Sequence, residues 1–460
     1  MSAIITSKFR LHNAEQFIES FNEAAKTTYY LFIGRPQPFG ASIGGGTDSS
    51  PPTPVDTVRD EFSYFRDMIA AKNVAISDIS YVVPRRNWTT GIVYDQYDHD
   101  YTVTNTSTSG ATNLYNSTFY VMNSNYNVYK CMWNNSGGAS TIEPSGTSTS
   151  EITTADSYVW KYMYSLTTSE VQNFLSTDFL PVSTDSTVSA AAIDGSIGQV
   201  KVTTAGTGYN NGTYPDVSVY GDGSSAKVRV TVTANAVSSI VVTTNGTGYT
   251  FANINIDSIS GIGTPSVSAV ATPIIGPKGG HGYNAVNELG AFYVMMSTSL
   301  VGTDASGDLV VNNDFRRIGL VRNPYDFGTT TICTTSTVSA LKTLTFESSP
   351  TPGTFVVDEV ITGATSGAKG RVVAWDAATR ILKYIQEEWS GVDTDNNLTA
   401  FAAAEIVQGT DSSAAGTITS GGVGNPEIDY NSGDIIYLEN RAPIVRASDQ
   451  TETIRLVIEF

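Results

Sequence analysis

Two regions of this chain contain internal repeats of strand-like motifs, and these repeats restrict the folds that it can form. In the first region, the eight-residue motif that ends in Gly-Thr-Gly-Tyr at 202–209 recurs at 242–249, an offset of 40 (246 − 206). A Gly-x-Gly pair recurs at the same offset, from Gly221 to Gly261. Each copy is typical of a strand, a glycine turn and a second strand, because glycine readily accepts the positive φ of such turns. Matching offsets at two places predict a small β-repeat domain over residues 191–276.

The second repeat lies within residues 336–425. A segment that begins at Glu359 recurs from Glu405, an offset of 46 (405 − 359), and both copies carry Ser, Ala and Gly at alternate positions. The pattern is typical of hairpins that bury one face against each other, and predicts a second inserted β-repeat domain. Its glycine-rich stretch at 363–370 lacks the Gly-Lys-Ser/Thr step of a phosphate-binding loop. The same turn recurs at Gly409 without a lysine, which favours a structural role.

The rest of the chain differs in character and is predicted to form one body that the two repeat domains interrupt. This body comprises an N-terminal part (residues 1–190), a middle part (277–335) and C-terminal strands (426–460). Most of it is typical of strands, because aromatic and β-branched residues dominate runs that Asn, Gly and Ser clusters separate. The clearest runs are 119–122, 128–132 and 159–164. The predicted fold class is therefore mainly β, multi-domain, with a few short helices and two inserted β-repeat domains.

Helix signals are few. Asn13 can cap a helix that has Glu15 in its first turn. Its apolar side follows at three- and four-residue spacing: Ala14, Phe17, Ile18, Phe21 and Ala25. A second helix is predicted near Pro54, with an apolar face formed by Val58, Phe62, Phe65 and Ile69. Between the two helices, residues 29–33 predict a buried strand that ends at Gly34, and the stretch 40–54 predicts a loop.

The composition limits the possible partners and compartment. The net charge of −18 at pH 7 repels phosphate backbones, so nucleic-acid binding is disfavoured. Two cysteines, Cys131 and Cys333, do not make a disulfide framework and fit a reducing compartment. The first residues lack the apolar core of a signal peptide, and no stretch approaches the roughly 20 apolar residues of a membrane span. We therefore expect the chain to be made and folded in a cytoplasm.

A few residues could suggest chemistry, but a structural interpretation is favoured for each. His99 lies among the oxygen donors of 95–100, where a metal site is conceivable, yet the Gly and Glu of a calcium loop are absent and a solvated acidic turn is favoured. His281 follows two glycines that could bring backbone near a ligand or partner, although a tight turn is the commoner explanation. The Glu-Glu pair at 387–388 beside Trp389 could suggest a glycosidase, but neighbouring strand residues point to opposite faces. We predict no catalytic, cofactor-binding or metal residues.

Two mixed patches are candidates for contact with another protein. Arg85, Arg86 and Trp88 form the densest combination of Arg and aromatic residues, and such residues are enriched at binding hot spots. The alternative is that the Arg stems pack over Trp88 within the same fold. Asn440 and Arg441 form a similar patch, for which packing within the fold is slightly favoured. These five residues are the candidate partner interface.

Several segments, in order along the chain, resemble one known family. They are Ile5–Arg10, Phe32–Pro38, Val83-Pro84-Arg85-Arg86-x-Trp88, Val128–Cys131, Tyr158–Tyr162, Phe315–Ile318, Asn323-Pro324, Ile436-Tyr437-x-Glu439-Asn440-Arg441-x-Pro443-Ile444 and Asp449–Glu452. Together they resemble the baseplate wedge subunit of T-even-type contractile-tailed bacteriophages, the gene product eight family. The resemblance covers the predicted body and not the two repeat domains.

The resemblance carries expectations about structure and partners. It implies stacked β-sandwiches, a homodimer within each wedge and contacts with other baseplate wedge proteins. It implies no catalysis and no cofactor. From the acidic charge and the lack of a long apolar stretch, we expect neither nucleic acid nor membrane as a partner. The protein would be made in the host bacterial cytoplasm and reside in the virion, in the tail baseplate. Its function would be structural: wedge assembly, and transmission of the baseplate rearrangement during contraction.

A second function remains open, that of a carbohydrate-binding tail module or adhesin. Tyr209 and Tyr249 occupy equivalent positions in the two Gly-Thr-Gly-Tyr motifs, where their rings could stack on sugars. The favoured alternative is that each ring covers its own hairpin turn.

Overall fold

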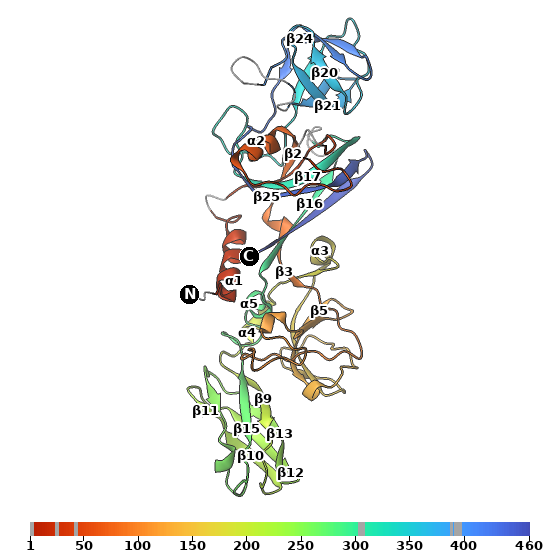
Figure 1. The fold of residues 1–460 in the computed structure, drawn as a ribbon. Coiled ribbons are helices and arrows are strands. Elements are labelled where there is room, and N and C mark those ends of the chain that lie inside the picture. Colours follow the sequence, from red (N-terminus) through yellow and green to blue (C-terminus); the bar gives the residue numbers. More distant parts are fainter. Residues whose placement is uncertain (1–3, 24–26, 41–44, 302–308, 387–389, 391–397) are drawn as a thin grey trace. The chain divides into compact units, whose positions relative to one another are not determined.

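The computed structural model describes residues 4–23, 27–40, 45–301, 309–386, 390 and 398–460 (Figure 1). Within these residues the chain is mainly β, as predicted, and consists of several separate sheets, a closed barrel and short helices. The predicted loop at 40–54 contains neither helix nor strand in its described residues.

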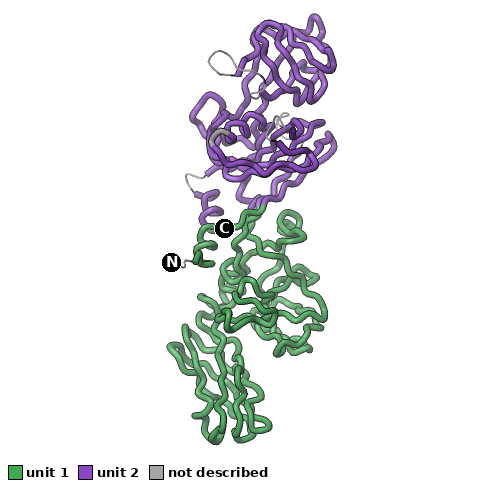
Figure 2. Tube along the Cα trace, viewed as in Figure 1, with its two compact units in different colours: residues 1–15, 80–295, 457–460 green, residues 16–79, 296–456 purple. Residues whose placement is uncertain are grey.

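The chain divides into two compact units (Figure 2). Unit 1 comprises residues 1–15, 80–295 and 457–460, and unit 2 comprises residues 16–79 and 296–456. The chain passes from one unit to the other after Glu15, Ile79, Met295 and Leu456. Neither unit is therefore a continuous stretch of sequence. The five-part division into a body and two inserts stays a prediction.

The largest open sheet of unit 2 has β1 at its centre. The strand order is β18 (Thr337–Ser339), β2 (Met68–Asn73), β1 (Tyr29–Gly34), β17 (Asn313–Arg322) and β25 (Asp434–Arg446). β1 pairs antiparallel with both neighbours, with Phe32 opposite Gly319, and it is buried along its whole length. A continuous apolar run suits a strand that is covered on both faces. The predicted strand and its end at Gly34 are confirmed.

The helix predictions near the N-terminus are only partly right. Helix α1 (Ser7–Glu19) begins well before Asn13, because the Thr6 hydroxyl accepts a hydrogen bond from the Phe9 amide at 3.3 Å and caps the first turn. The predicted start at Asn13 is therefore wrong, and Ala25 lies outside the described residues. Helix α2 (Val58–Arg66) is confirmed, with Thr57 as its cap. Ile69 belongs to β2 and not to this helix.

Unit 1 contains a sheet rich in aromatic residues. Its strand order is β4 (Tyr120–Met122), β5 (Asn127–Asn134), β7 (Tyr158–Ser165) and β6 (Ile152–Thr153), so the three clearest predicted strands are confirmed. The Trp160 ring is completely buried and stacks on Tyr158 with centroids 5.4 Å apart. Strand β3 (Ile79–Pro84) pairs with β8 (Phe179–Pro181) in a separate sheet of order β26-β16-β3-β8, which includes β16 (Tyr293–Val301) and β26 (Thr451–Glu459).

Short helical segments connect these strands. The α-helices are α3 (Thr168–Asn173), α4 (Ser186–Ala190) and α5 (Ala285–Leu289). The 3-10 turns are η1 (Ile76–Asp78), η2 (Leu114–Asn116), η3 (Asn135–Gly137) and η4 (Ile256–Ser258).

The first repeat forms short sheets around a core of its own within unit 1. Its strands are β9 (Ile197–Thr204), β10 (Gly212–Ser218), β11 (Tyr220–Gly221), β12 (Lys227–Thr233), β13 (Ala236–Thr244), β14 (Ala252–Asn253) and β15 (Val270–Ile275). They pair as β10-β12-β13, β11-β14 and β15-β9. Gly206 and Gly246, at equivalent places in the two motifs, have φ of 67° and 64°. The turns therefore use the conformation that favours glycine.

The second repeat closes into a six-stranded barrel in unit 2. The barrel order is β19 (Lys342–Phe346), β22 (Ile381–Ile385), β21 (Lys369–Asp376), β20 (Val360–Gly363), β23 (Ile406–Gly409) and β24 (Ala415–Gly424). Strands β20 and β23 are equivalent in the repeat and pair antiparallel, with Ile361 opposite Gly409 and Gly363 opposite Val407. The two copies are thus related by a local twofold arrangement. Closure leaves this module without the exposed strand edges of an open sheet.

Candidate partner interface

The Arg85, Arg86 and Trp88 patch follows strand β3 in unit 1. Arg85 donates from Nη1 to the Ser176 carbonyl at 2.7 Å and from Nε to Asn87. The Arg86 guanidinium lies 4.5 Å from the centroid of the Tyr120 ring. Trp88 donates from Nε1 to Ser140 Oγ at 3.1 Å. The three side chains are half-buried and bonded within unit 1, with Arg86 over a tyrosine and not over Trp88. Their role at an interface stays a prediction.

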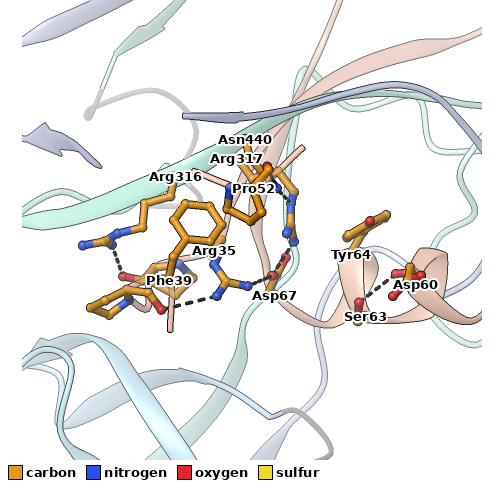
Figure 3. Close-up of polar contacts among 12 residues, drawn as sticks. Arg35, Phe39, Pro52, Asp60, Ser63, Tyr64, Asp67, Arg316, Arg317 and Asn440 are labelled. Atoms are coloured by element: carbon orange, nitrogen blue, oxygen red, sulfur yellow. Dashed lines mark hydrogen bonds and ion pairs between the residues drawn. The ribbon is translucent and has the colours of Figure 1, made fainter. Parts of the chain in front are cut away.

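Asn440 lies on β25 in unit 2, next to a buried cluster of charges (Figure 3). Its Oδ1 accepts from Arg317 Nε at 3.0 Å, and its Nδ2 donates to the Pro52 carbonyl at 2.9 Å. Arg317 also donates to the Asp67 carboxylate, and both of these residues are buried. The amide of Asn440 thereby links the buried arginine to the segment that precedes α2.

Asp67 is the carboxylate of this cluster, which also contains Arg35. The exposed fractions of Asp67, Arg35 and Arg317 are 1%, 4% and 3%. Burial raises the pKa of the Asp67 carboxyl, and the neighbouring Arg317 and Arg35 guanidiniums oppose that rise. The adjacent Arg316 forms a separate pair, with Asp48 at 2.9 Å. The cluster therefore fixes the strand β17 side chains against the segments around α2, and it has an internal structural role.

Arg441 differs from Asn440 because its side chain is half exposed. It is 51% exposed and donates from Nε to Glu439 at 2.8 Å. Strand β25 stands last in the order of its sheet and also exposes Ile436 (41%) and Val445 (63%). This strand therefore combines an accessible guanidinium with accessible apolar side chains, the mixture that is common at protein interfaces.

A second accessible surface, which the sequence did not reveal, lies at the start of the chain. Ile4, Ile5 and Phe9 are 85%, 71% and 54% exposed. We call these three residues the N-terminal apolar strip. Arg10 beside them is held in unit 1, with its guanidinium 4.3 Å from the Phe292 ring centroid. Grouped apolar side chains in water indicate a surface that another molecule covers. Their spacing in the sequence resembles that of a helix face that packs into a core. The sequence alone therefore does not distinguish an exposed apolar strip from a buried one.

A buried charged cluster in unit 1 was also not predicted. Lys130 of β5 donates to Glu288 of α5 and to Nδ1 of His281, and the three residues are 0%, 5% and 7% exposed. The glycines around His281 form the expected tight turn, since Gly280 and Gly282 have positive φ. Burial and the Lys130 charge lower the pKa of His281 well below its ordinary value, so its imidazole is neutral.

The favoured interpretation of the acidic stretch 95–100 as a solvated turn holds for His99 and Asp100, which lie in an exposed turn, and is wrong for the residues before them. Asp95 and Asp98 are 0% and 3% exposed. Asp95 accepts hydrogen bonds from the backbone amides of Ser109 and Thr118, both at 2.8 Å. Among the described residues no group of acidic, His and Cys side chains could hold a metal ion. The carboxylate instead ties together loops that are distant in sequence.

The tyrosines of the Gly-Thr-Gly-Tyr motifs cannot stack on sugars as they lie. Tyr209 and Tyr249 are 1% and 3% exposed. The Tyr209 hydroxyl accepts from the Ala269 amide at 2.7 Å, and the Tyr249 hydroxyl accepts from the Ala226 amide at 3.3 Å. Both rings belong to the hydrophobic core of the first repeat. The carboxylate pair at 387–388 and Trp389 lie outside the described residues.

Comparison with known protein families assigns a class to the N-terminal part of the chain. Residues 3–134, which include the N-terminal apolar strip, β1 and the Arg85–Trp88 patch, match a family of structural proteins of the phage baseplate wedge. That family is described as Phage-Gp8, Bacteriophage T4, Gp8, and the similarity is confined to this region of the chain. The match does not include the two repeat regions or β25. A search of curated proteins found no match.

The helices of the chain are short. In the part of the chain that the structure describes, none of them is long and apolar enough to cross a bilayer.

Proposed function

We propose that this protein is a wedge subunit of a contractile-tail baseplate that forms a homodimer and binds other wedge proteins. The match of residues 3–134 to the Gp8 family carries the proposal. The protein would act as a virion component after synthesis in the host cytoplasm. No catalytic step is part of this role.

Two surfaces are assigned to the partners in this proposal. The N-terminal apolar strip lies within the family-matched residues and exposes three large apolar side chains. Strand β25 offers Arg441 together with Ile436 and Val445. Apolar groups give binding free energy when they leave water, and a guanidinium adds directional hydrogen bonds. Arg85, Arg86 and Trp88 remain candidates for a minor part, since their polar groups are already bonded within unit 1.

The proposed mechanism is mechanical. Modules with closed barrels and aromatic cores resist deformation because their interiors are close-packed. A rearrangement of the baseplate would therefore change the contacts between proteins and leave each module intact. The wedge would transmit motion through rigid modules whose surfaces repack.

Light scattering on the purified chain, alone and mixed with the other tail proteins of its source, tests the proposal. We expect a dimer that joins a larger complex of defined mass. The variant Ile5→Asp/Phe9→Asp should weaken either the dimer or the complex, because two charges replace apolar groups that become buried. Phe251→Asp is the matched control, since Phe251 is also exposed (63%) but lies in the first repeat. A monomer that joins no other tail protein would overturn the proposal.

The β25 surface needs its own variant. Arg441→Glu reverses an exposed charge and should leave the fold unchanged, because exposed ion pairs contribute little to stability. We expect weaker association in the same light-scattering experiment. If Arg441→Glu assembles as the unmodified protein does, β25 is not a partner surface, and the N-terminal apolar strip is the remaining assigned surface.

A further inference from the structure

Unit 1 contains a pocket of about 630 Å³ that no part of the wedge role uses. Strands β9 and β13 of the first repeat form one wall, and β5 to β7 with neighbouring loops form the other. Six of its lining residues carry the argument: Gln96, Tyr101, Trp133, Glu151, Gln199 and Asn245. The size is that of a pocket for a small molecule or a few sugar rings.

Two aromatic rings line this pocket and are half-buried. Trp133 lies on β5 beside an irregularity in the pairing with β7, between Cys131 and Trp133. Such bulges redirect a side chain, and Trp133 is half-buried although Met132 and Asn134 on either side are buried. Tyr101 is held by a hydrogen bond from its hydroxyl to the Gln96 carbonyl at 2.7 Å. Both rings are therefore positioned without a ligand and keep a face accessible.

The polar groups of the pocket are mostly uncharged hydroxyls and amides. Within the described chain, the side-chain amides of Gln199 and Asn245 make no hydrogen bond, and the indole N–H of Trp133 makes none either. Glu151 and Lys201 are the charged side chains of the lining, one of each sign. Lys201 is already bonded to Asn105 at 2.7 Å. The pocket thus offers donors and acceptors without a net positive charge, which does not favour phosphate or nucleic acid.

Gly198 lines the pocket, and an unpaired buried donor lies close behind it. A Cβ at Gly198 would lie 3.1 Å from Met132 Cε, 3.4 Å from Glu151 Oε1 and 3.8 Å from His281 Nε2. Nδ1 of His281 accepts from Lys130, so the proton of the neutral ring is on Nε2. This Nε2 is buried and has no hydrogen-bond partner. The absent side chain of Gly198 lets β9 pack closely against Met132, Glu151 and His281.

We propose that this pocket binds a neutral oligosaccharide. Sugar hydroxyls both donate and accept, which matches the free amides of Gln199 and Asn245. The apolar C–H faces of a sugar ring suit the accessible faces of Trp133 and Tyr101. The site is distinct from Tyr209 and Tyr249, and it does not depend on the wedge role.

Saturation-transfer NMR on the full chain tests this site with maltotetraose, cellotetraose, chitotetraose and mannotetraose as probes. We expect transfer to at least one of the four sugars. Trp133→Ala and Gln199→Ala should each weaken binding of that sugar, by about tenfold for the tryptophan. Tyr220→Ala is the control, because Tyr220 is an exposed tyrosine (58%) outside the pocket lining.

The outcomes separate clearly. No transfer to any of the four sugars overturns the proposal, and so does binding that Trp133→Ala and Gln199→Ala both leave unchanged. Binding of tetra-alanine without a response from any sugar also overturns it, because the site would then be a peptide site. Gln199 is partly exposed, so its variant keeps the test valid if Trp133→Ala fails to fold. Wedge assembly measured on the same variants is expected to be unchanged.

Discussion

The carboxylate of Glu359 accepts hydrogen bonds from the Ser412 amide at 3.0 Å and from the Ser412 hydroxyl at 2.8 Å. The repeat makes this relationship reciprocal, because Glu405 accepts from the Ser366 amide at 2.9 Å and from its hydroxyl at 2.7 Å. Each copy in the barrel therefore supplies the acceptor for the turn of the other copy. Gly409 makes room for this, since a Cβ there would lie 2.4 Å from Glu359 Oε2.

Glu359→Gln should destabilise the barrel by about 1–3 kcal/mol, because hydrogen bonds to a charged acceptor are stronger than those to an amide. Glu405→Gln should have a similar effect through the Ser366 turn. Urea unfolding followed by amide exchange of peptides from 342–424 measures the loss. Glu347→Gln is the matched control on the same barrel, since its side chain is exposed. Equal unfolding midpoints for Glu359→Gln and Glu347→Gln would contradict the expectation.

Barrel stability should fall in acid through the same carboxyls. Burial raises the pKa of Glu359, but the hydrogen bonds from Ser412 and Val356 outweigh it, and the net pKa lies below its ordinary value. Glu405 has a lowered pKa in the same way. A depressed folded pKa gives stability that is complete above the unfolded value of about 4.3 and is lost as pH falls through the folded value. We expect a constant urea midpoint above about pH 5 and a decline below about pH 4.

The double variant Glu359→Gln/Glu405→Gln provides the test of that pH dependence. Its decline between about pH 5 and pH 3 should be smaller than that of the unmodified protein, because two of the titrating groups are gone. Pulsed amide exchange at a fixed pH, after equilibration at each pH and urea concentration, makes the comparison. An identical decline in both proteins would assign the acid sensitivity to other groups.

Lys130→Met should destabilise unit 1 by about 3–5 kcal/mol, because it leaves the buried Glu288 carboxylate without its countercharge. The double variant Lys130→Met/Glu288→Leu should recover most of this loss, since no buried charge then remains. Thermal and urea unfolding of the variants gives both values. Arg322→Met removes an exposed pair with Asp434 and should cost about 0–1 kcal/mol. A double variant no more stable than Lys130→Met would argue that packing dominates.

Gly319→Ala should destabilise the main sheet of unit 2 by about 1–3 kcal/mol. A Cβ at this position would lie 2.3 Å from Phe32 Cζ, and Phe32 is completely buried. Urea unfolding measures the cost. Gly421→Ala is the control, because nothing lies within 4 Å of a Cβ there. Equal stability of the two variants would show that Phe32 moves aside without cost.

Patterns of neighbouring residues were enough to predict several strands. The aromatic and β-branched runs at 128–132 and 159–164 became β5 and β7, because alternation and side-chain type suffice to define a strand. The start of α1 was missed because Thr6 and Asn13 are both good capping residues. The buried faces of Leu11 and Ala14 place Asn13 inside the helix, which the spacing alone did not reveal.

Contacts between distant residues could not be predicted in the same way. Lys130 and Glu288 have no local pattern that marks them as partners, and a lysine on a strand is usually exposed. The burial of Asp95 depends on amides of Ser109 and Thr118, which belong to later loops. The repeat indicated hairpins in the barrel, but its closure requires β19 to pair with both β22 and β24. The accessible N-terminal apolar strip was missed because exposure is a property of the folded molecule.

The chain passes between the two units four times, after Glu15, Ile79, Met295 and Leu456. These connections determine what a single cut in the backbone does to the protein. A nick at any one of these places leaves the units covalently tethered by the remaining connections. A single proteolytic cut or a single backbone break would therefore be silent in a gel filtration profile, although it would appear at once on a denaturing gel. In the proposed wedge, force between the units would be shared by several covalent connections, and the break of one connection would not separate the molecule.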